Sequence, residues 1–247
     1  IVISHRQNAN GIDISFQGSG TNLCSTDTLE LQSTSGFVNY SWSTGDTSQS
    51  IFAPAGNYSV KATDPNDLCV YKASVNLQAH EVYQSQQLCI VTVDTATGRN
   101  LVVWEQTPNA DIAAYKIWKR NDLTSEYESI GIVPIDSFST FIDVNSDPPQ
   151  QSSSYAVSVI DAVCGNESAL SPVHTTVHLS ANVGVNQQVN LQWDAYVGFS
   201  YSSFEVYRSS NGSAFVQIGN TANTVFSYTD LAPPAGTNYY YVAVTNS

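Results

Sequence analysis

The second half of the chain contains one pattern of residues twice. In each copy, alternating apolar positions that end in a Trp are followed by an aromatic-x-aliphatic-x-basic segment and, later, by Tyr-x-Val-x-Val. Trp104 and Tyr115 are 11 residues apart, and so are Trp193 and Phe204. A repeat whose apolar residues occur at every second position predicts two homologous β modules in tandem.

The first part of the chain also alternates in the manner of strands, from about residue 20 to residue 79. Apolar residues at alternate positions are separated by turn sequences rich in Gly, Pro, Asn and Asp, such as Pro54-Ala55-Gly56-Asn57. Residues 80–88 have no clear period and are expected to be a joint. The sequence therefore predicts an all-β protein of three consecutive β-sandwiches, over residues 1–79, 80–179 and 180–247.

The third module is short. Only 68 residues remain from Ser180 to Ser247, and the chain stops where its sixth strand ends. A missing last strand would leave an open sheet edge, which natural proteins avoid. We expect a fragment cut from a longer chain, and the alternative is a strand donated by another chain.

The charge excludes several classes of partner. The chain has 8 Lys and Arg against 21 Asp and Glu, for a net charge of −13. Binding to nucleic acid needs clustered cations, so no nucleic-acid partner is expected. No apolar run is long enough to span a bilayer, so we expect no membrane insertion. The first residues do not form a signal peptide, and the absence of Met suggests a mature or excised fragment.

Four widely spaced cysteines indicate the cellular setting. Cys24, Cys69, Cys89 and Cys164 include no CxxC pair, which disfavours a zinc site. Two structural disulfides are favoured over free buried thiols. A Cys24–Cys69 bond would close a loop of 45 residues, and a Cys89–Cys164 bond one of 75. Such bonds persist outside a reducing cytosol, which predicts a secreted or cell-surface protein.

Specific phrases carry a resemblance. The segments around Leu23-Cys24-Ser25, Tyr40-Ser41-Trp42 and Leu68-Cys69 are similar to the Ig-like or PKD-like repeats of secreted Bacteroidota proteins, in which the two cysteines usually pair. Val103-Trp104-Glu105 and Cys164-Gly165-Asn166-Glu167-Ser168 resemble tandem fibronectin type III modules found ahead of type IX secretion sorting domains. The resemblance implies a tyrosine corner at Tyr155 and Tyr240, whose hydroxyls would bond to backbone.

The chain contains no recognisable catalytic motif. Neither a GxSxG elbow nor a phosphate-binding glycine loop occurs, and the acidic residues are scattered, so we expect no enzyme activity. Asp143, Asn145 and Asp147 have the alternating oxygen ligands that begin a calcium loop. Pro148-Pro149 follows where such a loop needs Gly, so turn-capping Asx residues are favoured over a calcium site. No cofactor is expected.

Two outward aromatic residues are candidates for sugar binding. Trp118 and Tyr207 alternate with inward residues on their strands, although outward aromatics more often cover a neighbouring module or strand. If the resemblance holds, the O-glycan pattern of that phylum, Asp followed by Ser or Thr and an aliphatic residue, marks Thr28 and Thr95.

These observations predict an extracellular stalk, spacer, adhesin or filament segment of a longer secreted protein. Its partners would be other domains of the same polypeptide, and also other chains or glycans. The alternative, from a different class, is an accessory carbohydrate-binding segment of a secreted hydrolase.

Overall fold

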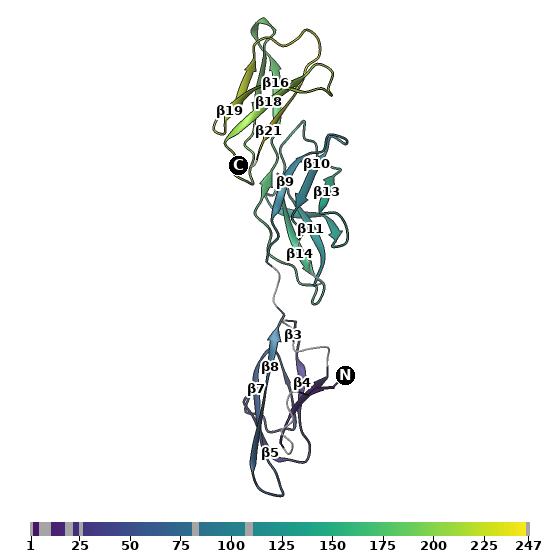
Figure 1. Cartoon of the computed structure of the whole chain (residues 1–247), viewed down its shortest axis with the longest axis vertical. Helices are drawn as coiled ribbons and strands as arrows, with labels where there is room; N and C mark the ends of the chain where they lie inside the picture. Colours follow the sequence, from purple (N-terminus) through teal and green to yellow (C-terminus); the bar gives the residue numbers. More distant parts are fainter. Residues whose placement is uncertain are drawn as a thin grey trace. The chain divides into compact units, whose positions relative to one another are not determined.

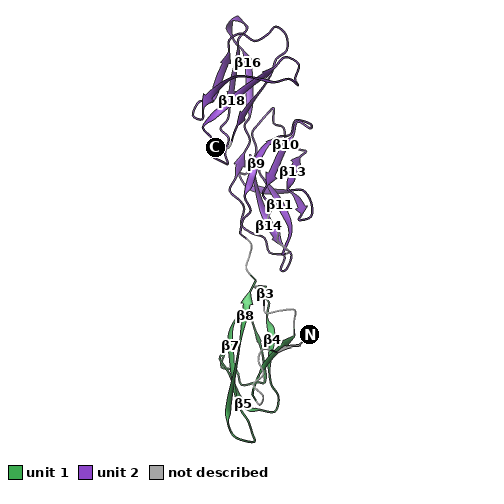
Figure 2. Ribbon diagram, viewed as in Figure 1, with its two compact units in different colours: residues 1–82 green, residues 83–247 purple. Residues whose placement is uncertain are grey.

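The computed structural model describes residues 2–4, 11–17, 22–24, 27–80, 84–106 and 111–245. In this part of the chain the regular structure is almost entirely β, with one short 3-10 turn, η1 (Val185–Gln187). No helix here has the length and apolar character needed to cross a membrane. The chain divides into two compact units, residues 1–82 and 83–247 (Figures 1 and 2). Residues 81–83 of the expected joint lie outside the described residues.

Unit 1 is a sandwich of two four-stranded sheets. The first sheet has the order β1 (Val2–Ser4), β2 (Ile14–Gln17), β4 (Leu29–Ser33), β6 (Ser50–Ala53). The second has the order β3 (Asn22–Leu23), β8 (Val70–Ala79), β7 (Gly56–Thr63), β5 (Val38–Trp42). Alternate residues of these strands, among them Leu31, Trp42 and Val60, form the core between the sheets, as the period of two requires.

The first sandwich of unit 2 has seven strands. One sheet has the order β13 (Thr140–Asp143), β10 (Asn100–Trp104), β9 (Leu88–Val93). The other has the order β12 (Tyr127–Pro134), β11 (Ile112–Arg120), β14 (Ser154–Asp161), β15 (His174–Thr175). Trp104, Tyr115 and Tyr155 are fully buried between them. The repeated Trp and the repeated aromatic residue are therefore core residues, as the repeat predicts.

The second sandwich of unit 2 has six strands. Its sheets have the orders β16 (Leu179–Val183), β17 (Val189–Trp193), β20 (Ser227–Asp230) and β19 (Val216–Ala222), β18 (Ser203–Ser209), β21 (Tyr239–Val244). Leu191, Trp193, Phe204 and Val206 are its buried core. Strand β21 pairs with β18 alone among the described residues, whereas its counterpart β14 lies between β11 and β15. The sequence predicted that the chain given ends with the sixth strand of this sandwich, and β21 is that strand.

A glycine under an aromatic ring is repeated in the two sandwiches of unit 2. A Cβ atom built on Gly131 would lie 2.4 Å from the ring of Phe141, and one on Gly219 would lie 2.5 Å from the ring of Tyr228. Each glycine therefore leaves room for an aromatic residue of the facing sheet. This matched close approach extends the duplication beyond the residues that the sequence pattern identified.

The two sandwiches of unit 2 also share packing. Tyr196, which follows β17, belongs to the core cluster of the preceding sandwich and is 6% exposed. Its hydroxyl lies 2.9 Å from Nδ1 of His174 on β15. Thr175 and Val197 form an isolated β-bridge at the same place. The junction is therefore held by both apolar and polar contacts.

Candidate functional site

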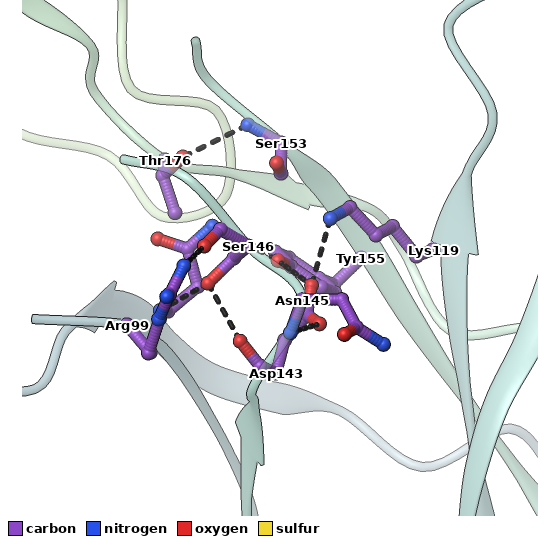
Figure 3. A network of polar contacts seen from close by, with 9 residues as sticks. Arg99, Lys119, Asp143, Asn145, Ser146, Ser153, Tyr155 and Thr176 are labelled. Carbon is purple, nitrogen blue, oxygen red and sulfur yellow. Dashed lines mark hydrogen bonds and ion pairs between the residues drawn. The ribbon is translucent and has the colours of Figure 1, made fainter. Parts of the chain in front are cut away.

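A buried polar network lies at the end of β11, where Lys119 occupies an inward position of the aromatic-x-aliphatic-x-basic segment. Its Nζ is 2.7 Å from Oδ2 of Asp143 on β13, whose side chain is 4% exposed. The Tyr155 hydroxyl donates to the same oxygen at 2.8 Å. Figure 3 shows these three side chains converging. Three strands of two sheets are thus joined through one carboxylate.

The network continues into the chain after β13. Asn100 donates from its side chain to the Tyr155 hydroxyl at 2.9 Å, and its backbone N–H donates to Oγ of Ser146. Ser146 Oγ donates to the carbonyl of Asp143, and Arg99 donates to the carbonyl of Ser146. These hydrogen bonds between buried groups fix one arrangement of the strands, and Oδ1 of Asn100 is the atom of that side chain left without a partner among the described residues.

The electrostatics follow from these contacts. Burial raises the pKa of Asp143, but the hydrogen bonds from Lys119 and Tyr155 and the charge of Lys119 outweigh it, so the pKa is lowered overall. Burial raises the pKa of Tyr155, and the adjacent Asp143 raises it further. At neutral pH the network therefore contains an ionised Asp143 and a neutral Tyr155.

The same arrangement recurs in the second sandwich of unit 2. Arg208 donates to Oδ2 of Asp230 at 2.7 Å, and the Tyr240 hydroxyl donates to that oxygen at 3.0 Å. Burial and then Asp230 raise the pKa of Tyr240 to about 12. The expectation that Tyr155 and Tyr240 bond to backbone is wrong, because the basic residue on β11 or β18 holds a carboxylate within reach of each hydroxyl.

This geometry also accounts for the residues considered as a calcium site. Oδ1 of Asp143 accepts the backbone N–H of Asn145 at 3.0 Å, which is an Asx turn. Its Oδ2 accepts hydrogen bonds from Lys119 and Tyr155. Asn145 and Asp147 are exposed, whereas Asp143 is buried. The structure thus forms the turn that the sequence favoured over a calcium site, and it gives the Asp143 carboxylate to an internal ion pair.

The cysteines differ from the expected pairs. Cys24 and Cys164 are disulfide-bonded, whereas Cys69 and Cys89 are exposed free thiols. Cys24 follows Leu23, which pairs with Ala79, and Cys69 precedes Val70 at the other end of β8. Ten residues of strand separate them by about 30 Å, and a disulfide needs Cα atoms within about 7 Å. The pair Cys24–Cys69 is therefore wrong.

The pair Cys89–Cys164 is wrong for a different reason. Cys89 is exposed on β9 between the buried Leu88 and the half-buried Ile90, so its thiol lies on the side of the strand away from the core. Cys164 belongs to the turn that follows β14, a strand of the opposite sheet. A side chain on the outer face of one sheet cannot reach a turn of the other through the core.

We expect iodoacetamide to modify Cys69 and Cys89 under non-reducing conditions, and to leave Cys24 and Cys164 unmodified. The reaction should be slow near pH 7, since the charge of Asp67 raises the pKa of Cys69, and burial raises the pKa of Cys89. Peptide mass mapping gives the sites, with a short cysteine peptide as the rate control. Protection of Cys69 would instead support the pairing that the sequence suggested.

The candidate sugar-binding aromatics already contact neighbours. Lys116 Nζ lies 4.3 Å from the ring centroid of Trp118, whose Nε1 donates to Ser158. Tyr207 stacks on Tyr241 with ring centroids 4.6 Å apart, and its hydroxyl donates to Glu205. The cross-strand contact that the sequence analysis gave as the alternative is therefore present at Tyr207.

The residues of the predicted O-glycan pattern are accessible. Thr28 is exposed just before β4, and Thr95 is exposed in the turn between β9 and β10. Asp94 before Thr95 accepts hydrogen bonds from Thr97, which lower the pKa of that carboxyl. The geometry leaves both hydroxyls open to modification.

Acid should weaken unit 2 through Asp143. Its pKa in the folded protein lies below the ordinary value of 3.8, so the stabilising charge is fully present above pH 3.8 and is lost as the pH falls through the folded value. Denaturant titrations between pH 5 and pH 2 should show a falling free energy of unfolding, with a shallower fall in Asp143→Asn. An equal slope in the two proteins would mean that Asp143 does not carry the effect.

The two ion pairs were missed from the sequence, although a signal for them exists. Lys119 and Arg208 each occur four residues after the inward aromatic residue of their strand, Tyr115 or Phe204. A cation at an inward position needs a buried anion. The Asp that recurs in each copy, Asp143 or Asp230, is that anion.

The comparisons with known proteins give distant structural similarities. No protein-family model and no curated protein matches the chain. The FN1–FN3 domains of chicken CNTN1 are 9% identical, with a TM-score of 0.31, over 96% of this chain and 92% of that one. A two-domain fibronectin type III segment of chicken tenascin is 12% identical, with a TM-score of 0.26. The similarity covers 66% of this chain and 98% of the tenascin segment. A tetra-tandem repeat of a large adhesion protein is 14% identical, with a TM-score of 0.27. The similarity covers 88% of this chain and 69% of that repeat structure. Similarities of this size say nothing about what this chain does.

Proposed function

We propose that the chain is an extracellular structural and adhesive segment, which spaces and presents other domains of a longer secreted polypeptide and has no catalysis of its own. The observation that carries this proposal is the continuous packing of unit 2. Tyr196 of one sandwich lies in the core cluster of the other, and His174 is hydrogen-bonded to it. A shared core suits a stiff spacer, because the sandwiches cannot separate without exposing apolar surface.

The chemistry of the chain supports an extracellular setting for this role. The disulfide-bonded Cys24 and Cys164 favour a compartment outside the reducing cytosol. The resemblance noted above makes secretion by the type IX route in a Bacteroidota organism part of the proposal, with O-glycans on Thr28 and Thr95. Other domains of the parent polypeptide, or a donated strand at β21, would be its partners.

Pulling single molecules of the full chain tests the spacer role. With the disulfide reduced, so that it does not shorten the chain that can extend, unit 2 should unfold in one step, since its two sandwiches share a core, and the step length should correspond to residues 83–247. Refolding after relaxation should restore the same step. Two separate steps at low force would contradict a stiff spacer.

A second function, an accessory carbohydrate-binding segment, is favoured by the aromatic cluster on β18 and β21. Tyr241 stacks on Tyr207, contacts Phe215 at a centroid distance of 4.8 Å and is 40% exposed. Binding to a glycan array that is lost in Tyr241→Ala and Tyr207→Ala would support this function. Phe138→Ala, at a side chain that is 89% exposed, is the matched control.

A further inference from the structure

The described positive side chains of unit 2 have partners within the protein, whereas two lysines of unit 1 do not. In unit 2 every described Lys and Arg has an internal partner. Ion pairs join Lys116 to Glu167, Lys119 to Asp143 and Arg208 to Asp230. Arg99 donates to the Ser146 carbonyl, and Arg120 donates to Ser125 Oγ. Lys61 and Lys72 are exposed and have neither an ion pair nor a side-chain hydrogen bond within the described residues of the chain. Their charges are therefore open to a partner from outside the chain, in a protein whose net charge is −13.

These two lysines face each other. Lys61 on β7 and Lys72 on β8 are direct partners in the antiparallel pairing. Both lie on the outer face of the sheet, because Val60 and Ala62 on either side of Lys61 are in the core. Directly opposed like charges destabilise a sheet. The lysine pair therefore lowers the stability of the sheet, and residues that serve a function are often destabilising in this way.

A hollow begins on the same face, next to the lysines. The adjacent cross-strand pairs are Ser59 with Ser74 and Asn57 with Asn76. With Ser43 of the neighbouring chain segment they line a shallow hollow of about 260 Å³. The distance along the strands from the lysine pair to the asparagine pair is about 13 Å. The surface thus combines two cations with an uncharged row of hydroxyls and amides.

The nearest acidic side chains along the strands are engaged elsewhere. Asp67 accepts hydrogen bonds from the Cys69 N–H and the Tyr71 hydroxyl, and Tyr71 packs against the core side of the sheet. Asp64 accepts hydrogen bonds from Asn66. Both carboxylates lie in the turn between β7 and β8, and neither neutralises the lysine pair.

We propose that this face of unit 1 binds an acidic polysaccharide, whose carboxylates lie at Lys61 and Lys72 and whose hydroxyls lie in the hollow. Amide and hydroxyl side chains donate to and accept from sugar hydroxyls. Asn76 donates to Asn57 at 2.5 Å, which leaves the amide nitrogen of Asn57 and the oxygen of Asn76 for such contacts. Nucleic acid is a poor fit, since its affinity comes from many phosphate contacts and this face offers two lysines. The inference rests on the proposed adhesive function, because it names what the segment adheres to.

The test measures binding of a galacturonic acid hexamer to the full chain at low salt, with maltohexaose as the neutral probe. Lys61→Gln with Lys72→Gln should weaken binding of the acidic hexamer by about tenfold, from two exposed charge contacts. Arg120→Gln removes an exposed positive charge from unit 2 and is the control for general attraction, which should change binding little. Asn57→Ala should weaken binding without altering its salt dependence.

The folding of the variants gives a second measurement. Since the lysines repel each other, the double variant should unfold at a temperature no lower than that of the unchanged protein, so weaker binding would not reflect unfolding. Equal binding of both hexamers, an equal loss in Arg120→Gln, or no binding of the acidic hexamer would overturn the inference. The single-step extension of unit 2 does not depend on this face, so the spacer role can fail or hold independently.

Discussion

Replacing Asp143 with alanine should lower the free energy of unfolding of unit 2 by about 3–5 kcal/mol. The side chain is 4% exposed, and its carboxylate accepts from Lys119 and Tyr155. Removing it leaves an ammonium without its counter-charge and a buried hydroxyl without its acceptor. Such orphaned groups cost more than the pair contributes when intact.

Chemical denaturation of the full chain, followed by tryptophan fluorescence, measures this loss. Asp136→Ala is the matched control, because Asp136 is an exposed carboxylate on the same sandwich and its removal should change stability by less than about 0.5 kcal/mol. Lys119→Met with Asp143→Leu, which removes both charges, should recover part of the loss. A loss in Asp143→Ala no larger than the control would show that the network does not stabilise the fold.

Replacing Tyr196 with alanine should cost about 3–5 kcal/mol and uncouple the two sandwiches of unit 2. The ring is 6% exposed and packs against Phe199 at a centroid distance of 4.7 Å and against His174 at 5.9 Å. Its removal leaves a cavity at the junction and takes away the hydroxyl that lies against Nδ1 of His174.

Two measurements distinguish the loss of stability from the uncoupling of the two sandwiches. Denaturation gives the lost stability, and pulling should show the single extension step of unit 2 divided into two. Phe138→Ala removes an aromatic ring that is 89% exposed and should change neither readout. A single step that persists in Tyr196→Ala would mean that the shared core does not couple the sandwiches.

The β architecture followed from local pattern. Burial alternates with a period of two, so Trp104, Tyr115 and their counterparts Trp193 and Phe204 were identified as inward residues from spacing alone. The six described strands of the last sandwich followed from the number of residues after residue 179, because each strand with its turn needs a known length of chain. These features depend on near neighbours in the chain.

Contacts between distant positions were not predictable in the same way. The sequence suggested a Cys24–Cys69 pair. In the structure β3, which precedes Cys24, pairs with the end of β8 that is far from Cys69. Tyr155 was expected to reach backbone, but its hydroxyl partner is supplied by β13 and held there by Lys119 of β11. Pairing of this kind depends on strand order and register, which the period of two does not specify.

The unmatched strand β21 has a consequence for refolding. β14 and β21 carry the same Tyr-x-Val-x-Val pattern, yet among the residues that the structure describes a further strand, β15, covers β14 and none covers β21. A chain returning from denaturant therefore offers the segment His174–Thr175 two similar docking strands, one native and one foreign. We expect a slow phase of recovery as wrongly docked molecules rearrange, a kind of trap that is typical of tandem repeats.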